Sequence, residues 1–411
     1  MHALEGLNPA QREAVLTPGG PLLILAGPGS GKTRVITHRI AHLVQNRGVS
    51  PHSIMAVTFT NKAAREMRSR LERLVGRRVD GLTVGTFHAT CARILRREAQ
   101  HVGVDPSFVI YDEDDQLGLV KQVLRDLELD EKRYPPRPFL NAISSAKSEL
   151  VGPHQYGEFT QSYWQEVAAR DYRRYQEMLA LNGAMDFDDL LMVAVQLFRS
   201  APEVLSRYQE RYVHLLVDEF QDTNVAQYAL VKLLGAGHRN VCVVGDPDQS
   251  IYSWRSADIR NILNFEKDYP DLKMVVLEQN YRSTATILET AEGVISSNKM
   301  RKAKRLWTEN PRGLPVTVFE AFDEREEASY VAREIERMVA REGFQLRDFA
   351  VMYRTNAQSR ALEDAFLRYG LRYKLVGGTR FYERREVKDV IAYLRLVQNP
   401  GDGVSMSRVV N

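Results

Sequence analysis

The sequence predicts an α/β fold whose core is a parallel sheet, and two observations support this prediction. Short apolar runs typical of buried parallel strands recur along the first two thirds of the chain. They span residues 21–26, 54–58, 82–85, 214–217, 241–244 and 274–277. Amphipathic helical segments such as 62–74 follow several of these runs, which is the rhythm of βαβ units in a doubly wound sheet.

A mostly helical stretch interrupts this rhythm from about residue 88 to residue 210. Its clearest helical patterns span residues 114–127, 163–181 and 186–198, and the prolines among them are Pro135, Pro136 and Pro138. We therefore predict a helical domain at 88–210 that is inserted into a first sheet domain formed by 1–87 and 211–278.

A second α/β pattern begins after the last strand of the first domain. We expect strands near 316–319, 349–353 and 373–376, and helices near 328–339 and 387–396. Residues 279–411 are therefore predicted to form part of a second α/β domain.

Composition sets broad limits on the class of protein. The 411 residues are 44% hydrophobic and 27% charged, which is enough to bury large cores in more than one domain. A net charge of +3 permits a nucleic-acid partner without requiring one. Cys91 and Cys242 lie far apart, so we expect structural thiols in a reduced interior. The sequence shows no signal peptide and no apolar run of about 18 residues, so we expect a cytoplasmic protein without a membrane partner.

The strongest local signal is a P-loop that lies directly after an apolar strand and before a helical pattern. Its residues are Ala26, Gly27, Pro28, Gly29, Ser30, Gly31, Lys32 and Thr33. Such a loop turns its backbone N–H groups toward phosphate oxygens. Lys32 would reach the β- and γ-phosphates of ATP, and Thr33 would supply a hydroxyl to Mg²⁺. Ala26 replaces the usual first glycine, which is tolerable at negative φ. The alternative is an ordinary glycine-rich turn.

Two carboxylates follow the apolar run 214–217. We assign Asp218 to Mg²⁺ and Glu219 to the proton of the attacking water, because parallel strands present such residues to a ligand at their carboxyl ends. The alternative is a capping cluster, because Asp222 and Thr223 follow and such residues often open helices, but capping accounts for these two residues and not for the first pair.

The segment after the apolar run 241–244 places a glutamine beside two aromatic residues. Gln249 is a candidate for hydrogen bonding to the γ-phosphate, whereas Tyr252 and Trp254 are candidates for stacking on bases. Single aromatic residues are more often part of a core. Their position next to Gln249 nevertheless predicts a link between the state of ATP and the grip on a nucleic-acid strand.

Several motifs occur in the order found in the superfamily 1A DNA helicases of the UvrD, PcrA and Rep type, which this chain resembles over essentially its whole length. Besides the segments above, the matching motifs lie at residues 7–11, 58–64, 85–88, 279–284, 353–360 and 377–378. The resemblance implies RecA-like sheet domains, with ATP and Mg²⁺ as cofactors.

The resemblance also implies roles around the nucleotide. Gln11 is similar to the family's adenine-reading glutamine, and Tyr281 and Arg34 would hold the ring between them. Arg282 resembles the arginine that contacts the γ-phosphate and stabilises charge in the transition state.

The resemblance further implies a set of residues that contact single-stranded DNA. They are Phe59, Asn61, Thr86, His88, Phe187, Tyr252, Trp254, Arg255 and Asn356. A lone histidine such as His88 is also common as a hydrogen-bonded structural residue. Ser256 stands where the family usually has glycine.

The implied function is an ATP-dependent 3′-5′ DNA helicase or translocase in DNA repair and replication. Its expected substrates are single-stranded DNA and single/double-strand junctions, and repair or replication proteins are possible partners. We expect the chain to be a fragment, because the family's remaining motifs do not follow residue 411.

The residues leave three competing hypotheses open. One is a nuclease-fused relative of the AddA or RecB kind, although the compact insertion and Gly377-Gly378 are closer to PcrA. A second is a nucleotide-dependent DNA-binding module that does not unwind its substrate. A third is a P-loop switch that binds only protein, but this hypothesis gives no reason for the aromatic residues next to Gln249.

Overall fold

The chain forms two compact units. The computed structural model describes residues 4–298, 304–376 and 385–410. One unit comprises Met1–Gly313 with Tyr393–Asn411, and the other comprises Leu314–Ala392. Residues 279–313, which we expected to begin the second α/β domain, thus belong to the same compact unit as the first sheet.

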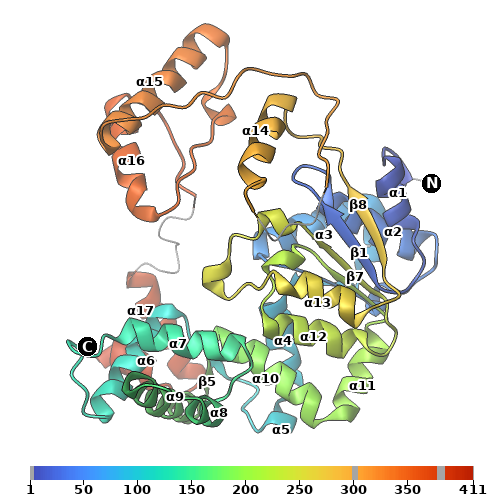
Figure 1. Cartoon of the computed structure of the whole chain (residues 1–411). Coiled ribbons are helices and arrows are strands. Elements are labelled where there is room, and N and C mark those ends of the chain that lie inside the picture. Colours follow the sequence, from blue (N-terminus) through green and yellow to red (C-terminus); the bar gives the residue numbers. More distant parts are fainter. Residues whose placement is uncertain (1–3, 299–303, 377–384, 411) are drawn as a thin grey trace. The chain divides into compact units, whose positions relative to one another are not determined.

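The first unit contains a six-stranded parallel sheet, as predicted (Figure 1). The strand order is β3-β2-β6-β7-β1-β8. The strands are β1 (Leu22–Ala26), β2 (Ile54–Thr58), β3 (Thr83–Thr86), β6 (His214–Val217), β7 (Val241–Gly245) and β8 (Lys273–Leu277). All six predicted strands are confirmed, with bounds that shift by at most one residue.

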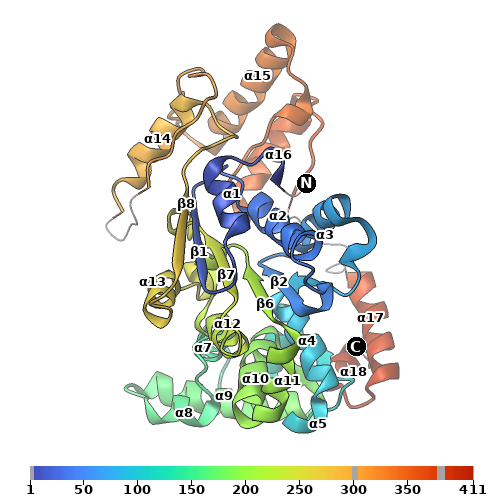
Figure 2. The same ribbon diagram turned by 90° about the vertical axis from the view of Figure 1, so that its right-hand side faces the viewer.

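Both faces of this sheet are covered by helices, so its central strands are buried throughout (Figure 2). Alternation along β1 sends Leu22 and Ile24 into one core and Leu23 and Leu25 into the other. The first core is covered by α1 (Pro9–Leu16), α2 (Lys32–Gln45) and α3 (Asn61–Val75). The second is covered by α4 (Phe87–Arg97), α10 (Phe187–Ser200), α11 (Pro202–Arg211), α12 (Val225–Gly235) and α13 (Arg260–Asp268).

The middle of the predicted helical insertion has a core of its own. It is built from α6 (Glu113–Asp126), α7 (Pro136–Ser148), α8 (Pro153–Glu158) and α9 (Tyr163–Leu181), beside the short parallel pair β4 (Val109–Ile110) and β5 (Ala184–Met185). The small helix α5 (Ala99–Val102) leads into this part. A fully buried Lys147 fastens α7 to the start of α10, with Nζ 2.6 Å from Asp186 and 2.8 Å from Asp189.

The last helices of the chain pack on this insertion. They are the end of α17 (Arg385–Gln398) and α18 (Gly403–Val410). The buried Tyr111 hydroxyl donates to Asp402 over 2.5 Å, and Arg395 forms an ion pair of 2.8 Å with Asp115. The two contacts join residues that lie about 280 to 290 positions apart in sequence.

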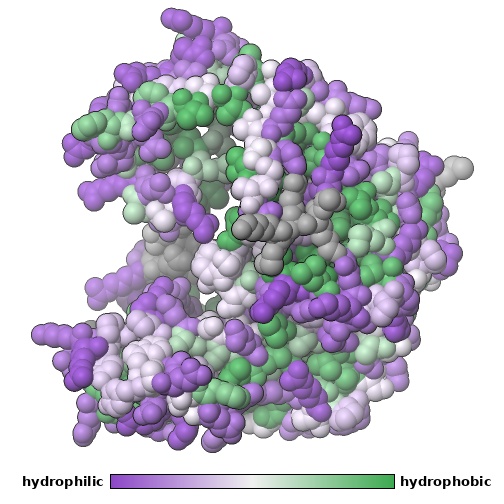
Figure 3. All heavy atoms as spheres, viewed as in Figure 1, coloured by the Kyte–Doolittle hydropathy of each residue, from purple (hydrophilic) through white to green (hydrophobic). Residues whose placement is uncertain are grey.

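The second unit is helical where it is described, with α15 (Glu324–Glu342), α16 (Ser359–Arg368) and the beginning of α17. Ala332, Ile335 and Phe366 form its small core. The strands predicted at 316–319, 349–353 and 373–376 are wrong, because these segments have no strand neighbours and form no ladder hydrogen bonds there. Consequently, hydrophobic residues of this unit are left at the surface (Figure 3).

One short helix, α14 (Ala285–Ile295), follows the sheet in the first unit. Across the described ranges of the chain, no helix has the length and apolar character needed to cross a lipid bilayer.

Asp171 on α9 gives a test of the insertion's packing. Both carboxylate oxygens are buried without a hydrogen-bond partner among the described residues, and burial raises the carboxyl pKa to about 7. The folded state therefore holds this proton at pH values where the unfolded state has lost it, so stability rises as pH falls from 8 toward 5. We expect Asp171→Asn to stabilise the protein by about 1–3 kcal/mol at pH 8.

Urea unfolding at pH 8 and pH 5 measures this effect. The increase in the free energy of unfolding caused by Asp171→Asn should be smaller at pH 5, because the wild-type carboxyl is protonated there. Glu166→Gln on the exposed face of the same helix is the matched control, with an expected change below about 0.5 kcal/mol. An Asp171→Asn gain that is equal at both pH values would contradict this account.

Candidate functional site

The loop between β1 and α2 has the geometry of a phosphate-binding loop. Gly29 and Gly31 adopt φ values of +66° and +93°, which residues with a Cβ rarely adopt. The Ser30 hydroxyl donates to the Gly27 carbonyl over 2.7 Å and closes the loop on itself. Helix α2 begins at Lys32, so the positive end of its dipole faces the loop.

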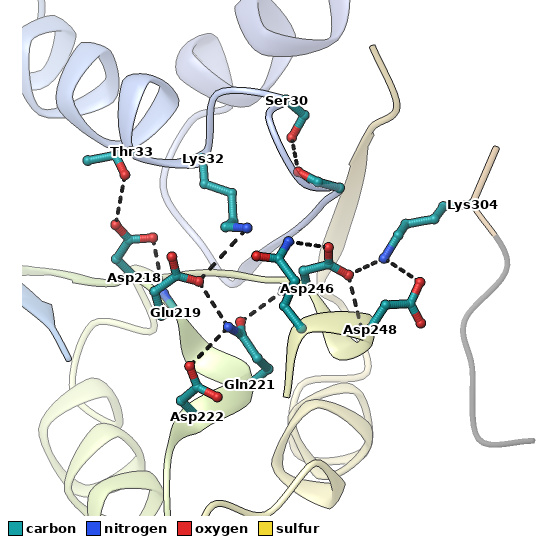
Figure 4. Close-up of polar contacts among 12 residues, drawn as sticks. Ser30, Lys32, Thr33, Asp218, Glu219, Gln221, Asp222, Asp246, Asp248 and Lys304 are labelled. Atoms are coloured by element: carbon teal, nitrogen blue, oxygen red, sulfur yellow. Dashed lines mark hydrogen bonds and ion pairs between the residues drawn. The ribbon is translucent and has the colours of Figure 1, made fainter. Parts of the chain in front are cut away.

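An acid pair lies at the end of β6, opposite this loop (Figure 4). The Thr33 hydroxyl donates to Asp218 over 3.3 Å, and the Glu219 N–H donates to the other oxygen of Asp218. Lys32 Nζ lies 3.9 Å from a carboxylate oxygen of Glu219. The structure therefore brings together Lys32, Thr33, Asp218 and Glu219, four of the residues that the sequence assigned to phosphate, metal and water.

The two acids differ in their surroundings. Asp218 is buried, and burial followed by the neighbouring Glu219 raises its pKa to about 7. Glu219 is partly exposed and adopts φ +51° and ψ +46°, a left-handed conformation that is uncommon for a residue with a side chain. This turn directs its carboxylate toward Lys32, whereas the Asp218 carboxylate faces Thr33.

A chain of hydrogen bonds connects the acid pair to the loop after β7 (Figure 4). The Gln221 amide donates to Glu219 over 2.9 Å and accepts from the Asp246 backbone N–H, also over 2.9 Å. Asp246 is fully buried and accepts from the Gln249 amide over 2.5 Å. Gln249, the predicted γ-phosphate ligand, is thus joined to Glu219 through two side chains.

The predicted adenine-binding residues surround the entrance to the P-loop. The buried Gln11 donates to the Ser30 carbonyl over 2.8 Å and accepts from the Asn8 N–H, which completes a capping box on α1. An amide has two donors and two acceptor sites, so bonds to adenine remain possible. The exposed Tyr281 is tied to the loop by its N–H, which donates to the Gly29 carbonyl, and Arg34 is exposed nearby on α2.

Arg282 is exposed at the same place, next to Gly29. A Cβ added to Gly29 would lie 2.8 Å from the Cβ of Arg282. Asn280 holds this turn, because its side chain donates to the Pro28 carbonyl over 2.6 Å and accepts from the Arg282 and Ser283 N–H groups.

Three of the predicted DNA-contacting aromatic residues form a continuous row. The rings of Phe59 and Tyr252 stack with centroids 5.1 Å apart, and Tyr252 and Trp254 are 6.0 Å apart. Trp254 is 62% exposed although it is a large aromatic residue. Phe59 follows β2 and the other two follow β7, so the row runs along the carboxyl edge of the sheet.

A second pair joins the start of α4, which follows β3, to the start of α10. The rings of His88 and Phe187 are in edge contact at 5.8 Å, and Phe187 is 47% exposed. Burial lowers the His88 pKa to about 4, so this ring is neutral near pH 7. Thr86 is buried and caps α4, whereas Asn61 is exposed at the start of α3.

The other two predicted DNA-contacting residues are Asn356 and Arg255. Asn356 begins a 3₁₀ turn in the second compact unit. Arg255 ends the turn Ser253–Arg255, but its side chain lies outside what the structure describes, as does the segment Gly377-Gly378.

Sequence reasoning missed three residues that organise the site. Gln221 and Asn280 lie inside recognised motifs, and an Asn followed by Ser three positions later is a turn signal that could have indicated the role of Asn280. Lys304 had no local signal. Its ammonium is buried between Asp246 and Asp248, with Nζ 2.8 Å from the latter.

The fold and this loop define the class. A parallel sheet with a phosphate loop after its first strand and an acid pair at a neighbouring strand end is a RecA-like P-loop fold. The chain belongs to the UvrD/REP helicase family. Residues 7–270 match the UvrD/REP helicase N-terminal domain, and residues 275–411 match the UvrD-like helicase C-terminal domain.

The similar proteins include three that are named ATP-dependent DNA helicase PcrA. Those of Bacillus subtilis (strain 168) and Staphylococcus aureus (strain Mu50) are each 50% identical over 408 residues, which is 99% of this chain. The protein of Staphylococcus epidermidis is 50% identical over 412 residues. The alignments cover 55% or 56% of these relatives, so the chain spans about half of their length.

Ser256 gives a prediction about the aromatic loop. It adopts φ +60° and ψ +20°, a left-handed conformation that glycine adopts with less strain than serine. Replacing serine by glycine removes the strain of the left-handed conformation, but glycine also has more conformational freedom in the unfolded state. Because the first effect is larger, we expect Ser256→Gly to stabilise the protein by about 0.5–1 kcal/mol. Ser253→Gly in the same turn is the control and should be destabilising. Urea unfolding compares the two variants, and equal losses in both would contradict the account.

Proposed function

We propose that this chain is the ATP-hydrolysing, strand-gripping part of a 3′-5′ DNA helicase that acts in DNA repair and replication. The observation that carries the proposal is the short distance along the chain from Gln249 to Tyr252 and the exposed Trp254, which form an aromatic row with Phe59. One loop thereby joins a group suited to a phosphate with rings suited to bases. The relatives' printed name, ATP-dependent DNA helicase, supports it.

ATP fits the P-loop because the chain offers both backbone donors and a cation. Lys32 would contact the β- and γ-phosphates, with residues 26–33 around them and with Gln11, Arg34 and Tyr281 at the adenine. In the proposed ATP-bound state, Lys32 would exchange its contact with Glu219 for the phosphates.

The residues at the end of β6 also fit Mg²⁺. Asp218 is a buried carboxyl that carries a raised pKa and faces a hydroxyl, and a hard cation would offset the cost of its charge. Asp218 and Thr33 would hold the ion, which supplies charge neutralisation at the phosphates when bound.

Glu219 is the proposed base. Its carboxylate is partly accessible and is held by Gln221, so it can accept a proton from a water that attacks the γ-phosphate. Arg282 would stabilise the charge that develops on the transferred phosphoryl group. Gln249 would bind the γ-phosphate and so couple its presence to the position of the aromatic row.

The finer parts of the proposal rest on family resemblance. They are the 3′-5′ direction, single-stranded DNA and single/double-strand junctions as substrates, repair or replication proteins as partners, and a cytoplasmic location. The proposed motor domains are 1–87 with 211–278 and part of a second at 279–411, with the insertion at 88–210. Asn61, Thr86, His88, Phe187, Arg255 and Asn356 remain proposed DNA contacts.

Glu219→Gln tests the hydrolytic part. We expect wild-type ATP turnover to be stimulated by single-stranded DNA, and the variant to lose about 100-fold or more while it still binds ATP, because the amide cannot accept the proton. Steady-state ATPase assays and fluorescent-nucleotide titration measure the two quantities. Glu210→Gln, on the exposed surface of α11, is the matched control. Full turnover in Glu219→Gln would remove the assigned role of this residue.

Strand displacement separates this proposal from a binding module. A helicase should displace a strand from a duplex with a 3′ tail and not from one with a 5′ tail, in the presence of ATP. DNA affinity that responds to ATP without displacement would favour the module, and the absence of single-strand affinity at low salt would favour a switch that binds protein.

Trp254→Ala tests the grip on DNA. A base stacked on an aromatic ring is worth about 1–3 kcal/mol, so we expect binding of an oligothymidine to weaken by about 5- to 150-fold. Fluorescence anisotropy measures the affinity. Phe322→Ala removes an almost fully exposed aromatic residue of the second unit and should leave the affinity unchanged. Equal affinities in Trp254→Ala and wild type would exclude stacking on this ring.

A further inference from the structure

A short segment outside the recognised motifs contacts three parts of the nucleotide site. Residues 304–308, here called the bridge segment, lie between α14 and the end of the first unit. The segment pairs with the strand end that leads to Arg282, through a parallel bridge between Gln279 and Trp307. It also reaches the P-loop and the loop after β7.

The first contact of the bridge segment is with the turn that carries Tyr281 and Arg282. The Asn280 N–H donates to the Trp307 carbonyl over 2.8 Å, and the Thr308 hydroxyl donates to the Asn280 carbonyl over 2.8 Å. These bonds hold the same asparagine whose side chain binds the Pro28 carbonyl of the P-loop.

The second contact is with the P-loop itself. Leu306 packs so closely on Gly27 that a Cβ at this glycine would collide with the leucine side chain. A side chain at this position would therefore force the Leu306 side chain to move.

The third contact is ionic and buried. The Lys304 side chain is 4% exposed, and its ammonium lies between the carboxylates of Asp246, which is fully buried, and Asp248, whose side chain is 10% exposed (Figure 4). The same Asp246 accepts from the Gln249 amide and donates its backbone N–H to Gln221. Lys304 is thus bonded to the residue that links Gln249 to the Glu219 side of the site.

We propose that Lys304 is a positioning residue for ATP hydrolysis, which holds Asp246 so that Gln249 and, through Gln221, Glu219 keep their places. This inference rests on the proposed function. It also assigns the bridge segment as the connection through which the turn bearing Arg282 and the loop bearing Gln249 are held in one arrangement.

The charge of Lys304 is what the arrangement requires. Two carboxylates in a largely dry place repel each other, and removal of one member of a buried ionic group leaves an uncompensated charge. Without the ammonium, the Asp246 carboxylate would turn toward water. That movement would release the Gln249 amide and alter the geometry of the loop after β7.

The test compares three variants of the full 411-residue chain. Lys304→Met keeps the length of the side chain and removes its charge, and Lys304→Arg restores the charge. Lys232→Met is the control, because this lysine forms an ion pair of 2.9 Å with Asp268 at the surface, away from the loop. Each variant is checked for folding by circular dichroism. Its kcat and KM for ATP with oligothymidine are then measured, together with hydrogen exchange of peptides covering residues 246–254.

We expect Lys304→Met to lower kcat by about 10- to 100-fold, with a much smaller change in KM, because a misplaced catalytic group costs rate more than binding. Hydrogen exchange at residues 246–254 should become faster. Lys304→Arg should recover much of the rate, and Lys232→Met should match the wild type in both measurements.

Several results would overturn the assignment. Wild-type kcat in folded Lys304→Met would do so, as would unchanged exchange at residues 246–254. Faster exchange with an unchanged kcat would reduce Lys304 to a structural role. If the wild-type chain hydrolyses no ATP, the proposed function fails independently. The exchange measurement then decides whether Lys304 holds the loop, and unchanged protection refutes it.

Discussion

The parallel alignment of the central strands is the constraint on which the candidate site depends. Strands β6, β7 and β1 lie side by side in one direction, so the loops that follow them emerge at the same edge. These loops carry Glu219, Gln249 and Lys32. Residues more than 180 positions apart, such as Thr33 and Asp218, are thereby brought within hydrogen-bond distance. Reversal of any one strand would send its loop to the opposite edge, so no single side-chain contact could substitute for this alignment.

The same edge concentrates acidic groups, and this sets the electrostatic character of the site. Asp218, Asp222 and Asp246 are all buried, and burial raises the pKa of the first two to about 7. Among the described residues, Lys32 is paired with Glu219, the neighbour of Asp218, and Lys304 is paired with Asp246 and Asp248. One contacts the acid pair, and the other contacts the loop after β7. Under the proposed function, Lys32 would exchange its contact with Glu219 for the phosphates of ATP. Lys304 would keep its contacts with the two carboxylates.

The sequence predicted those features that depend on local residue order. Glycine spacing imposes the P-loop turn, and amphipathic spacing imposes helices such as α9, so both could be read from short windows. Apolar runs located the six strands of the first sheet for the same reason. The strands expected in the second unit failed because a strand also needs neighbours, which a local pattern does not supply. The role of Lys304 could not be predicted from the sequence, because its partners lie 56 and 58 positions earlier in the chain and only the folded structure brings them together.

The contacts of the last helices with the insertion have a consequence for the order of folding during synthesis. The core of the insertion is complete once α9 and β5 have formed, yet the Tyr111 hydroxyl waits for Asp402, 291 residues later. Burying a hydroxyl without its acceptor costs about 1–3 kcal/mol of folding free energy. Until Asp402 has been synthesised, we therefore expect the Tyr111 hydroxyl to stay in contact with water. Domains made early generally fold early, on the ribosome. In this protein the core of the insertion would form early, and the contact between Tyr111 and Asp402 would form later. The interval between the two events grows with slower translation.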